Sequence, residues 1–123
     1  MINAYIAGIG MTKFGRFPDE SVKSLTSKAV SMALRDSGIS LERIQAAFFA
    51  NTVQGALEGQ LMVRGQIALR PLGLEGIPII NVENACASSA TALSLALNYI
   101  RAGAADVVLA VGVLLLAVGA IFS

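Results

Sequence analysis

The amino-acid sequence predicts an α/β domain with a mostly parallel sheet and helices on both of its faces. Short apolar runs alternate along the chain with segments of helical spacing, and this order favours parallel strands joined by right-handed crossovers. One of the runs, residues 107–111, is apolar throughout, which is typical of buried parallel strands. The 123 residues have the length of one domain.

Composition narrows the possible classes of function. The chain is 55% hydrophobic and 14% charged, and its net charge of +1 provides no basic surface for nucleic acid. A single cysteine cannot form an internal disulfide, so we expect a reducing compartment, the cytoplasm. No basic segment followed by an apolar one opens the chain, so no signal peptide is expected. We expect no metal site and no cofactor.

The first predicted strand is the apolar run Ala4 to Gly8, which Gly8 and Gly10 would end. A helix follows, with apolar residues at helical spacing from Val22 to Ala33. Asp19 or Ser21 can cap its start. At its end, residues 38 and 39 are a glycine and an isoleucine, which predict a Schellman-type close.

The second predicted strand is Ala46 to Ala50, and a polar connection, Asn51 to Gln60, follows it. Open α/β sheets bind ligands at the carboxyl ends of such strands. Asn51, Gln54 and Glu58 could therefore face a site or a partner subunit, although ordinary loop polarity explains them more simply. A short helix is predicted over residues 61–69, with Arg64 and Arg70 on a solvated face.

The third predicted strand, Ile77 to Glu83, leads into a long helix that ends near Arg101 and Gly103. Apolar residues lie nearly all round this helix, which predicts that it is buried. Its predicted core positions recur at steps of four and three: Cys86, Ala90, Leu93, Leu97 and Ile100. Ser88 and Ser89 are expected to be ordinary residues of the first turn. A fourth strand is expected over residues 107–111.

Cys86, the only cysteine, falls at the junction between the third strand and this helix. A thiol at a strand-to-helix turn meets backbone amides and the positive end of the helix dipole, which favour the thiolate over the thiol. This position suits a nucleophile. The alternative is that Cys86 is a small buried hydrophobic residue, as most lone cysteines are.

The stretch Val82 to Leu93 resembles the nucleophilic-cysteine segment of the thiolase superfamily, and most of all the thiolases related to sterol-carrier and lipid-transfer proteins. Weaker resemblances continue over Ala4 to Gly15, Gln60 to Gly73 and Asp106 to Gly112. Together they cover about residues 2 to 113. The fold implied is the N-terminal half of a thiolase, truncated, which in the family packs against a similar second half.

The resemblance also implies a function in lipid metabolism. In an intact enzyme like acetyl-CoA acetyltransferase, Cys86 would accept an acyl group from an acyl-CoA thioester, which is a substrate and not a cofactor. The family resemblance suggests a homodimer joined near the third strand. The family's histidines and second reactive cysteine come from its C-terminal half, however, and this chain contains no histidine. Whether this chain alone is an enzyme is therefore open.

The end of the chain departs from the thiolase pattern, because it stays apolar where the family turns polar. We divide the sequence into a thiolase-like part, residues 1–113, and an apolar tail, residues 114–123. The tail could follow a truncation or frame shift near Val113, which we favour, or form a strand and helix buried in this domain or in a partner. It could also belong to a membrane segment, but Val107 to Phe122 as a helix would span about 24 Å, short of the roughly 30 Å hydrocarbon core.

Three functions remain possible. The first is acyl transfer through Cys86 in the intact enzyme. The second is a catalytically incompetent N-terminal fragment that acts, if at all, as an association module, because apolar faces that lack their partner half tend to associate. The third is a small protein tethered to a membrane by its apolar C-terminal segment.

Overall fold

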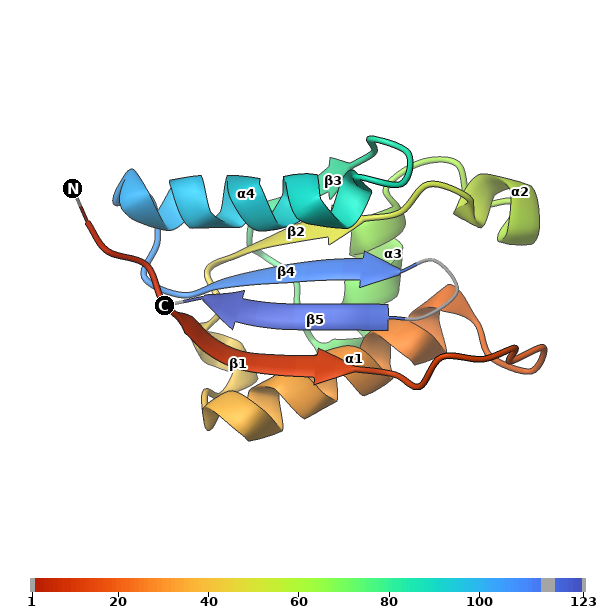
Figure 1. Ribbon diagram of the computed structural model, residues 1–123, viewed down its shortest axis with the longest axis horizontal. Coiled ribbons are helices and arrows are strands. Elements are labelled where there is room, and N and C mark those ends of the chain that lie inside the picture. The colour runs from red at the N-terminus through yellow and green to blue at the C-terminus, as the bar shows by residue number, and fades with distance from the viewer. Residues whose placement is uncertain (1, 114–116, 123) are drawn as a thin grey trace.

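The computed structural model, which describes residues 2–113 and 117–122, forms a five-stranded sheet with the order β1-β5-β4-β2-β3 (Figure 1). Its strands are β1 Ile6–Met11, β2 Ala46–Ala50, β3 Ile79–Val82, β4 Val108–Val113 and β5 Ala117–Phe122. β2 pairs in parallel with β3 and β4, whereas β5 is antiparallel to both β1 and β4. Four strands thus share one direction, and the predicted α/β class is confirmed.

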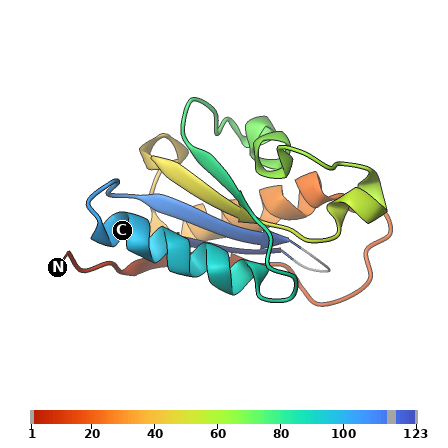
Figure 2. The same cartoon turned by 90° about the horizontal axis from the view of Figure 1, so that it is seen from above.

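Helices cover both faces of the sheet, as predicted (Figures 1 and 2). The α-helices are α1 Val22–Ser37, α2 Gln54–Glu58, α3 Arg64–Leu69 and α4 Ser88–Arg101, and two short 3₁₀ helices are Leu41–Arg43 and Arg70–Leu72. α1 and α3 pack on one face, and α4 packs on the other, mainly over β4 and β2. The sequence analysis did not predict α2.

The core consists of two apolar layers, one on each side of the sheet. Along β2, Ala46, Phe48 and Ala50 pack in the α4 layer, whereas Ala47 and Phe49 pack in the α1 layer. This alternation follows from the two-residue period of a strand. All residues of β2 and β4 are buried, which confirms the predicted buried strand in the region of β4.

The first strand differs from the prediction because Gly8 and Gly10 lie inside β1 and do not end it. A Cβ atom on Gly8 would lie 2.6 Å from the carbonyl oxygen of Ala33, and one on Gly10 would lie 2.3 Å from that of Ala29. Both carbonyls belong to α1. The two glycines therefore serve close helix–strand packing, a tertiary role that their usual reading as chain breakers missed.

α1 begins and ends near the predicted positions. Ser21 is the N-cap: its side chain accepts a hydrogen bond from the Ser24 amide, and the Ser24 hydroxyl accepts one from the Ser21 amide, which completes a capping box. Gly38 ends the helix in the left-handed region at φ 68°, with its N–H donating to the Leu34 carbonyl. The Ile39 N–H donates to the Ser37 hydroxyl and not to a backbone carbonyl of α1, so the close is of the αL type and not the predicted Schellman type.

α4 begins at Ser88, two residues beyond Cys86, and buries only one face. The buried face consists of Ser88, Ala92, Ala96 and Ile100, which are spaced four residues apart. Leu93 is 43% exposed and Leu95 is 39% exposed. The prediction of a buried helix with Cys86, Ala90 and Leu93 in the core was therefore wrong, because the described chain packs against one side of α4 only.

The described part of the tail forms β5, which lies between β1 and β4 and buries Ile121 and Phe122. The interpretation of Val107 to Phe122 as a single membrane segment would require one helix where the structure has the strands β4 and β5. Among residues 2–113 and 117–122, no helix has both the length and the apolar character needed to cross a membrane. The predicted boundary between residues 113 and 114 stays a prediction, and residues 114–116 lie outside the described chain.

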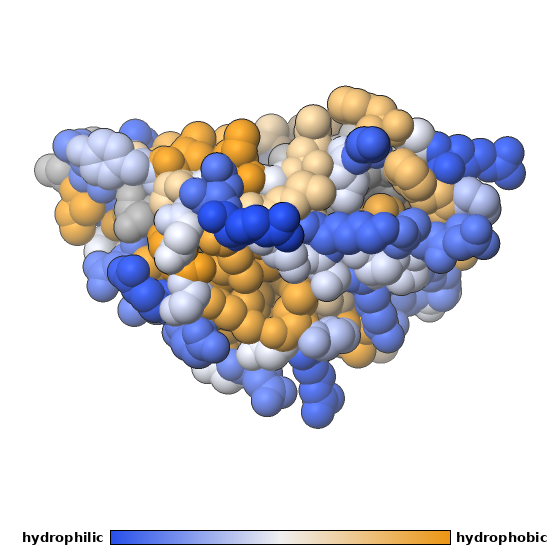
Figure 3. Space-filling view, turned by 90° about the horizontal axis from the view of Figure 1, so that it is seen from below, coloured by the Kyte–Doolittle hydropathy of each residue, from blue (hydrophilic) through white to orange (hydrophobic). Residues whose placement is uncertain are grey.

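Large apolar side chains remain exposed on several elements. Figure 3 shows apolar surface interrupted by hydrophilic side chains on the side of the molecule that carries α1 and β1. The exposed apolar residues of these two elements are Ile6, Ile9, Met11 and Met32. Others lie on or near α2, α3 and α4, namely Leu57, Leu61, Met62, Val63, Leu93 and Leu95.

Candidate active site

Cys86 lies exposed in the turn between β3 and α4, at the predicted strand-to-helix junction. The residue before it, Ala85, has a left-handed backbone with φ 49°. This conformation usually costs a residue with a side chain about 1–2 kcal/mol, because its Cβ approaches the following carbonyl oxygen. The turn that carries the thiol is thus held in a conformation that the chain would not adopt unaided.

Hydrogen bonds hold both backbone groups of Ala85. Its N–H donates to the Glu83 carboxylate at 2.5 Å. Its carbonyl oxygen accepts from the Ser88 N–H at 3.2 Å, from the Ser88 hydroxyl at 2.7 Å and from the Thr52 hydroxyl at 3.0 Å. These partners provide a physical reason for the left-handed conformation of Ala85.

Ser88 is the centre of this arrangement. It is 5% exposed, and its hydroxyl oxygen also accepts a hydrogen bond from the Asn84 N–H at 2.7 Å. The Thr52 and Ser88 hydroxyl oxygens lie 3.0 Å apart. Ser88 is a first-turn residue, as expected, but it also links the turn to Thr52, which follows β2.

The backbone N–H groups directly after Cys86 are engaged within the turn. The Ala87 N–H donates to the Asn84 carbonyl at 2.9 Å, and the Ser88 N–H donates to the Ala85 carbonyl. An oxyanion formed at Cys86 would therefore need donors other than these two groups, or a rearranged turn.

The start of α4 packs directly on the end of β4. A Cβ atom on Gly112 would lie 2.0 Å from the Ser89 Oγ and 2.9 Å from the Ser89 Cβ. Only a glycine in β4 leaves room for this approach. Gly112 thus helps to place the first turn of α4, and with it the turn that bears Cys86.

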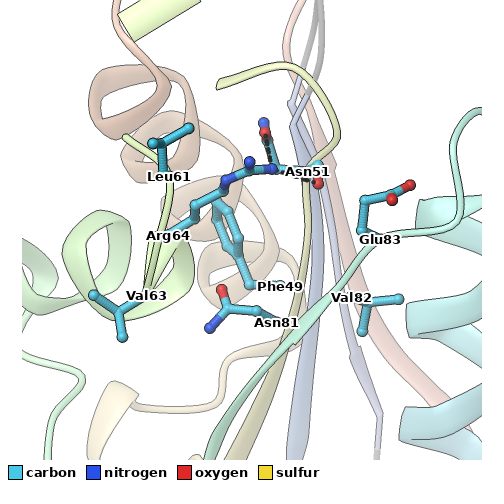
Figure 4. Close-up of a pocket in the computed structure, with 8 residues that line it drawn as sticks. All are labelled: Phe49, Asn51, Leu61, Val63, Arg64, Asn81, Val82 and Glu83. Carbon is cyan, nitrogen blue, oxygen red and sulfur yellow. Dashed lines mark hydrogen bonds between the residues drawn. The ribbon is translucent and has the colours of Figure 1, made fainter. Parts of the chain in front are cut away.

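A pocket of about 210 Å³ opens near the carboxyl ends of β2 and β3 (Figure 4). Its lining residues are Phe49, Asn51, Leu61, Val63, Arg64, Asn81, Val82 and Glu83. In Figure 4 the Arg64 side chain reaches towards Asn51, and its Nη1 donates to the Asn51 carbonyl at 3.1 Å. The pocket is smaller than typical ligand sites of about 300–1,000 Å³, and Cys86 does not line it.

The polar residues that follow β2 pack within the chain. The Asn51 side chain is buried, and it donates to the Val113 carbonyl at 2.6 Å and accepts from the Gln54 N–H at 2.8 Å. The Glu58 carboxylate accepts from the Val22 N–H at 3.0 Å, at the start of α1. Asn51 and Glu58 thus hydrogen-bond to distant parts of the chain, and Asn51 also lines the pocket. That these residues face a site or a partner subunit stays a prediction.

The two arginines of the α3 region differ in their surroundings. Arg64 is partly buried, and its guanidinium donates to the carbonyls of Gln60 and Asn51, so the expected solvated position is wrong for it. Arg70 is exposed, with its Nε 3.6 Å from the Glu75 carboxylate. Within the described residues, no three His, Cys, Asp or Glu side chains come together as metal ligands.

Residues 4–117 match the thiolase N-terminal domain. The match covers most of the chain, and the protein belongs to the thiolase family. It is 40% identical over 111 residues to a non-specific lipid-transfer protein-like protein of Caenorhabditis elegans, covering 88% of this chain and 26% of that protein. It is 38% identical over 113 residues to the acetyl-CoA acetyltransferase of Methanocaldococcus jannaschii, covering 92% of this chain and 29% of the enzyme. The chain thus spans about a quarter of the length of these curated relatives.

Solved structures show the same fold at low identity. The 3-oxoacyl-[acyl-carrier-protein] synthase III of Aquifex aeolicus superposes with a TM-score of 0.83 at 16% identity, over 98% of this chain and 54% of the synthase. OleA of Xanthomonas campestris superposes with a TM-score of 0.82 at 14% identity, over 99% of this chain and 56% of that protein. The thiolase-like fold, predicted from the resemblance, is confirmed.

Thr52, which contacts the turn that carries Cys86, was not among the candidate site residues predicted from the sequence. Its only signal was its place, a hydroxyl residue two positions after a buried strand, at the sheet edge where parallel strands present loop residues. Nothing local indicated that this hydroxyl meets a turn 33 residues further along the chain.

Proposed function

We propose that Cys86 carries an acyl group in a thiolase-type enzyme of which this chain forms the N-terminal domain. One observation carries the proposal: the only thiol of a thiolase-family domain is exposed on a restrained turn between β3 and α4. A nucleophile must be both reachable and held in place, and this turn meets both conditions.

In the proposed reaction, the Cys86 sulfur attacks the carbonyl carbon of an acyl-CoA thioester. A new bond forms between the Cys86 sulfur and this carbon, the bond to the coenzyme A sulfur breaks, and coenzyme A leaves as a thiolate that takes up a proton. The Cys86 proton passes to a base. The 123 residues include no histidine, the commonest general base, so we propose that solvent accepts it. A second acceptor, a carbanion or a coenzyme A thiol, then takes the acyl group.

We also propose a substrate, an oligomeric state and a cellular compartment. The substrate is an acyl-CoA thioester, with acetyl-CoA as the probe, because one relative is named acetyl-CoA acetyltransferase. A homodimer of the intact enzyme, joined along β3, is supported by the sheet order, in which β3 pairs with β2 and leaves its other edge open. The cytoplasm suits a chain with a single exposed thiol.

The direct test is incubation of the full chain with acetyl-CoA followed by intact-mass analysis. We expect one added acetyl group per chain, absent in Cys86→Ala. Repeated turnover is not expected without a base. A folded wild-type chain that gains no acetyl group would rule out acylation by this chain alone.

A second candidate, an association module without catalysis, is favoured by the exposed apolar residues of α4 and β1. Self-association without acetylation in the same samples would support this function. A monomeric chain that becomes acetylated would count against it.

A further inference from the structure

We propose that Thr52 is a positioning residue for Cys86, because its hydroxyl ties the turn that carries the thiol to the end of β2. The inference concerns the geometry of this turn, and its catalytic meaning rests on the proposed function. The observation behind it is the Thr52 hydroxyl 3.0 Å from both the Ala85 carbonyl oxygen and the Ser88 hydroxyl oxygen.

Thr52 lies far from the turn in the sequence, unlike the turn's other hydrogen-bond partners. Glu83 follows β3 and Ser88 is the first residue of α4, so both belong to the continuous stretch of chain that contains the turn. Thr91 of α4 also hydrogen-bonds the 83–88 segment, so within residues 2–113 and 117–122 Thr52 is the only such partner outside the stretch from β3 to α4. β2 pairs with β4 and β3 on its two edges and is fully buried, so Thr52 follows a strand that is held on all sides.

The two hydroxyl protons can satisfy two of the three contacts among Thr52, Ser88 and the Ala85 carbonyl at a time. Thr52 and Ser88 each have one hydroxyl proton. If Ser88 donates to the Ala85 carbonyl, then Thr52 donates to the same carbonyl or to the Ser88 oxygen, which already accepts from the Asn84 N–H. In either arrangement both hydroxyl protons are donated to an oxygen, and the two protons do not point at each other.

The atom that these hydroxyls hold matters for the thiol. The Ala85 carbonyl belongs to the peptide group that joins Ala85 to Cys86, and this group is planar. Fixing its oxygen therefore fixes the direction in which the chain enters Cys86. Without the Thr52 hydroxyl, only Glu83 and Ser88 hydrogen-bond Ala85 and stabilise its unfavourable φ of 49°.

The test compares Thr52→Val, which removes the hydroxyl at similar volume, with Thr52→Ser, which keeps it. Thr26→Val is the matched control, because Thr26 is fully buried on α1 and its hydroxyl has no hydrogen-bond partner within the described chain. Three quantities are measured on the full chain. They are amide hydrogen exchange, acetylation of Cys86 by acetyl-CoA, and alkylation of Cys86 by iodoacetamide.

In Thr52→Val, we expect exchange at the Ala85, Ala87 and Ser88 amides to accelerate about five-fold, as for one lost hydrogen bond, while exchange in α1 stays unchanged. Acetylation should slow about five-fold, and alkylation, which requires less alignment, should change by less than about two-fold. Thr52→Ser and Thr26→Val should both behave as the wild type.

Two results would overturn the proposal. One is unchanged exchange at these amides in Thr52→Val, which would mean that the hydroxyl does not hold the turn. The other is equal acceleration in the turn and in α1, which would indicate general destabilisation. If the wild type is not acetylated but the local exchange behaves as expected, the positioning of the turn stands and the proposed function of this chain alone fails.

Discussion

At the scale of single residues, glycines decide how closely the helices approach the sheet. The backbone of α1 packs against Gly8 and Gly10, and the first turn of α4 packs against Gly112. In each case a Cβ atom would lie closer to a neighbour than real Cβ atoms do. These positions are therefore sensitive to the smallest possible substitution.

We predict that Gly112→Ala lowers the free energy of unfolding by about 1–3 kcal/mol, because the new methyl group overlaps Ser89 at the start of α4. Denaturant unfolding measures this loss. Adding Ser89→Ala should restore part of it, since the nearest atom is the Ser89 Oγ. Gly15→Ala is the control, because a Cβ there meets only the partly exposed Phe17 ring at 3.2 Å. Equal stability of Gly112→Ala and the wild type would contradict the close packing.

A second residue-scale prediction concerns Glu20. Its hydrogen bonds from Lys28 and then Ser24, together with the Lys28 charge, hold the pKa of the Glu20 carboxyl below its ordinary value of 4.5. The folded state therefore binds the proton more weakly than the unfolded state. The contribution of Glu20 to stability is complete above the ordinary value and is lost as the pH falls through the lowered one.

Comparison of the wild type with Glu20→Gln over pH 2–7 tests this expectation. The difference in unfolding free energy should be constant near neutral pH, shrink in acid, and become smaller at high salt because the pair is exposed to solvent. Lys28→Met should remove most of the same acid dependence, since Lys28 is the main cause of the shift. A difference that grows in acid would contradict the assignment.

At the scale of elements, the start of α1 combines a side-chain cap with a carboxylate from another helix. Ser21 and Ser24 form a reciprocal capping box, and no acidic residue lies in the first turn. The Glu58 carboxylate of α2 accepts a hydrogen bond from the Val22 N–H and so places a negative charge at the start of α1. The start of α1 is thus stabilised both locally and by a distant element.

We predict that Ser21→Ala lowers the free energy of unfolding by about 1 kcal/mol, because it leaves the Ser24 N–H without its acceptor. Ser31→Ala is the matched control, since Ser31 lies in the middle of α1 and alanine favours a helix there. The measurement is thermal or urea unfolding of both variants. Equal stability of Ser21→Ala and Ser31→Ala would show that the cap contributes nothing.

At the scale of the whole molecule, the two faces of the sheet are covered unequally. α1 packs along β1 and β5, whereas α4 packs mainly over β4 and β2. Ile9 and Met11 alternate with the glycines that face α1, so they point to the α4 side, where both are at least half exposed. Leu93 and Leu95 of α4 are also exposed. This side of the molecule therefore presents apolar surface to solvent.

We predict that the chain self-associates over about 1–100 μM, because burying this surface is favourable. Sedimentation velocity measures the association. The double variant Ile9→Lys and Leu93→Lys should shift the chain towards monomer with little loss of stability, since both side chains are exposed. Leu57→Lys, a similar change on α2, should leave the association unchanged. A monomeric wild type over the whole range would contradict the prediction.

Features that depend on near neighbours in the chain were predictable from the sequence. The bounds of β2, the glycine that ends α1 and the place of Cys86 between a strand and a helix all follow from periodicity, capping preferences and a short motif. The motif also indicated the thiolase family, which the comparison with known proteins confirmed. The alternative interpretation of Cys86, as a small buried hydrophobic residue, was wrong because the thiol is exposed.

Only the tertiary structure decided the remaining features. The insertion of β5 between β1 and β4, the packing role of Gly8, Gly10 and Gly112, and the contact of Thr52 with the Cys86 turn all join segments far apart in the sequence. The physical reason is that propensity and capping act over a few residues. Strand pairing, close packing and long-range hydrogen bonds instead depend on which surfaces the folded chain brings together.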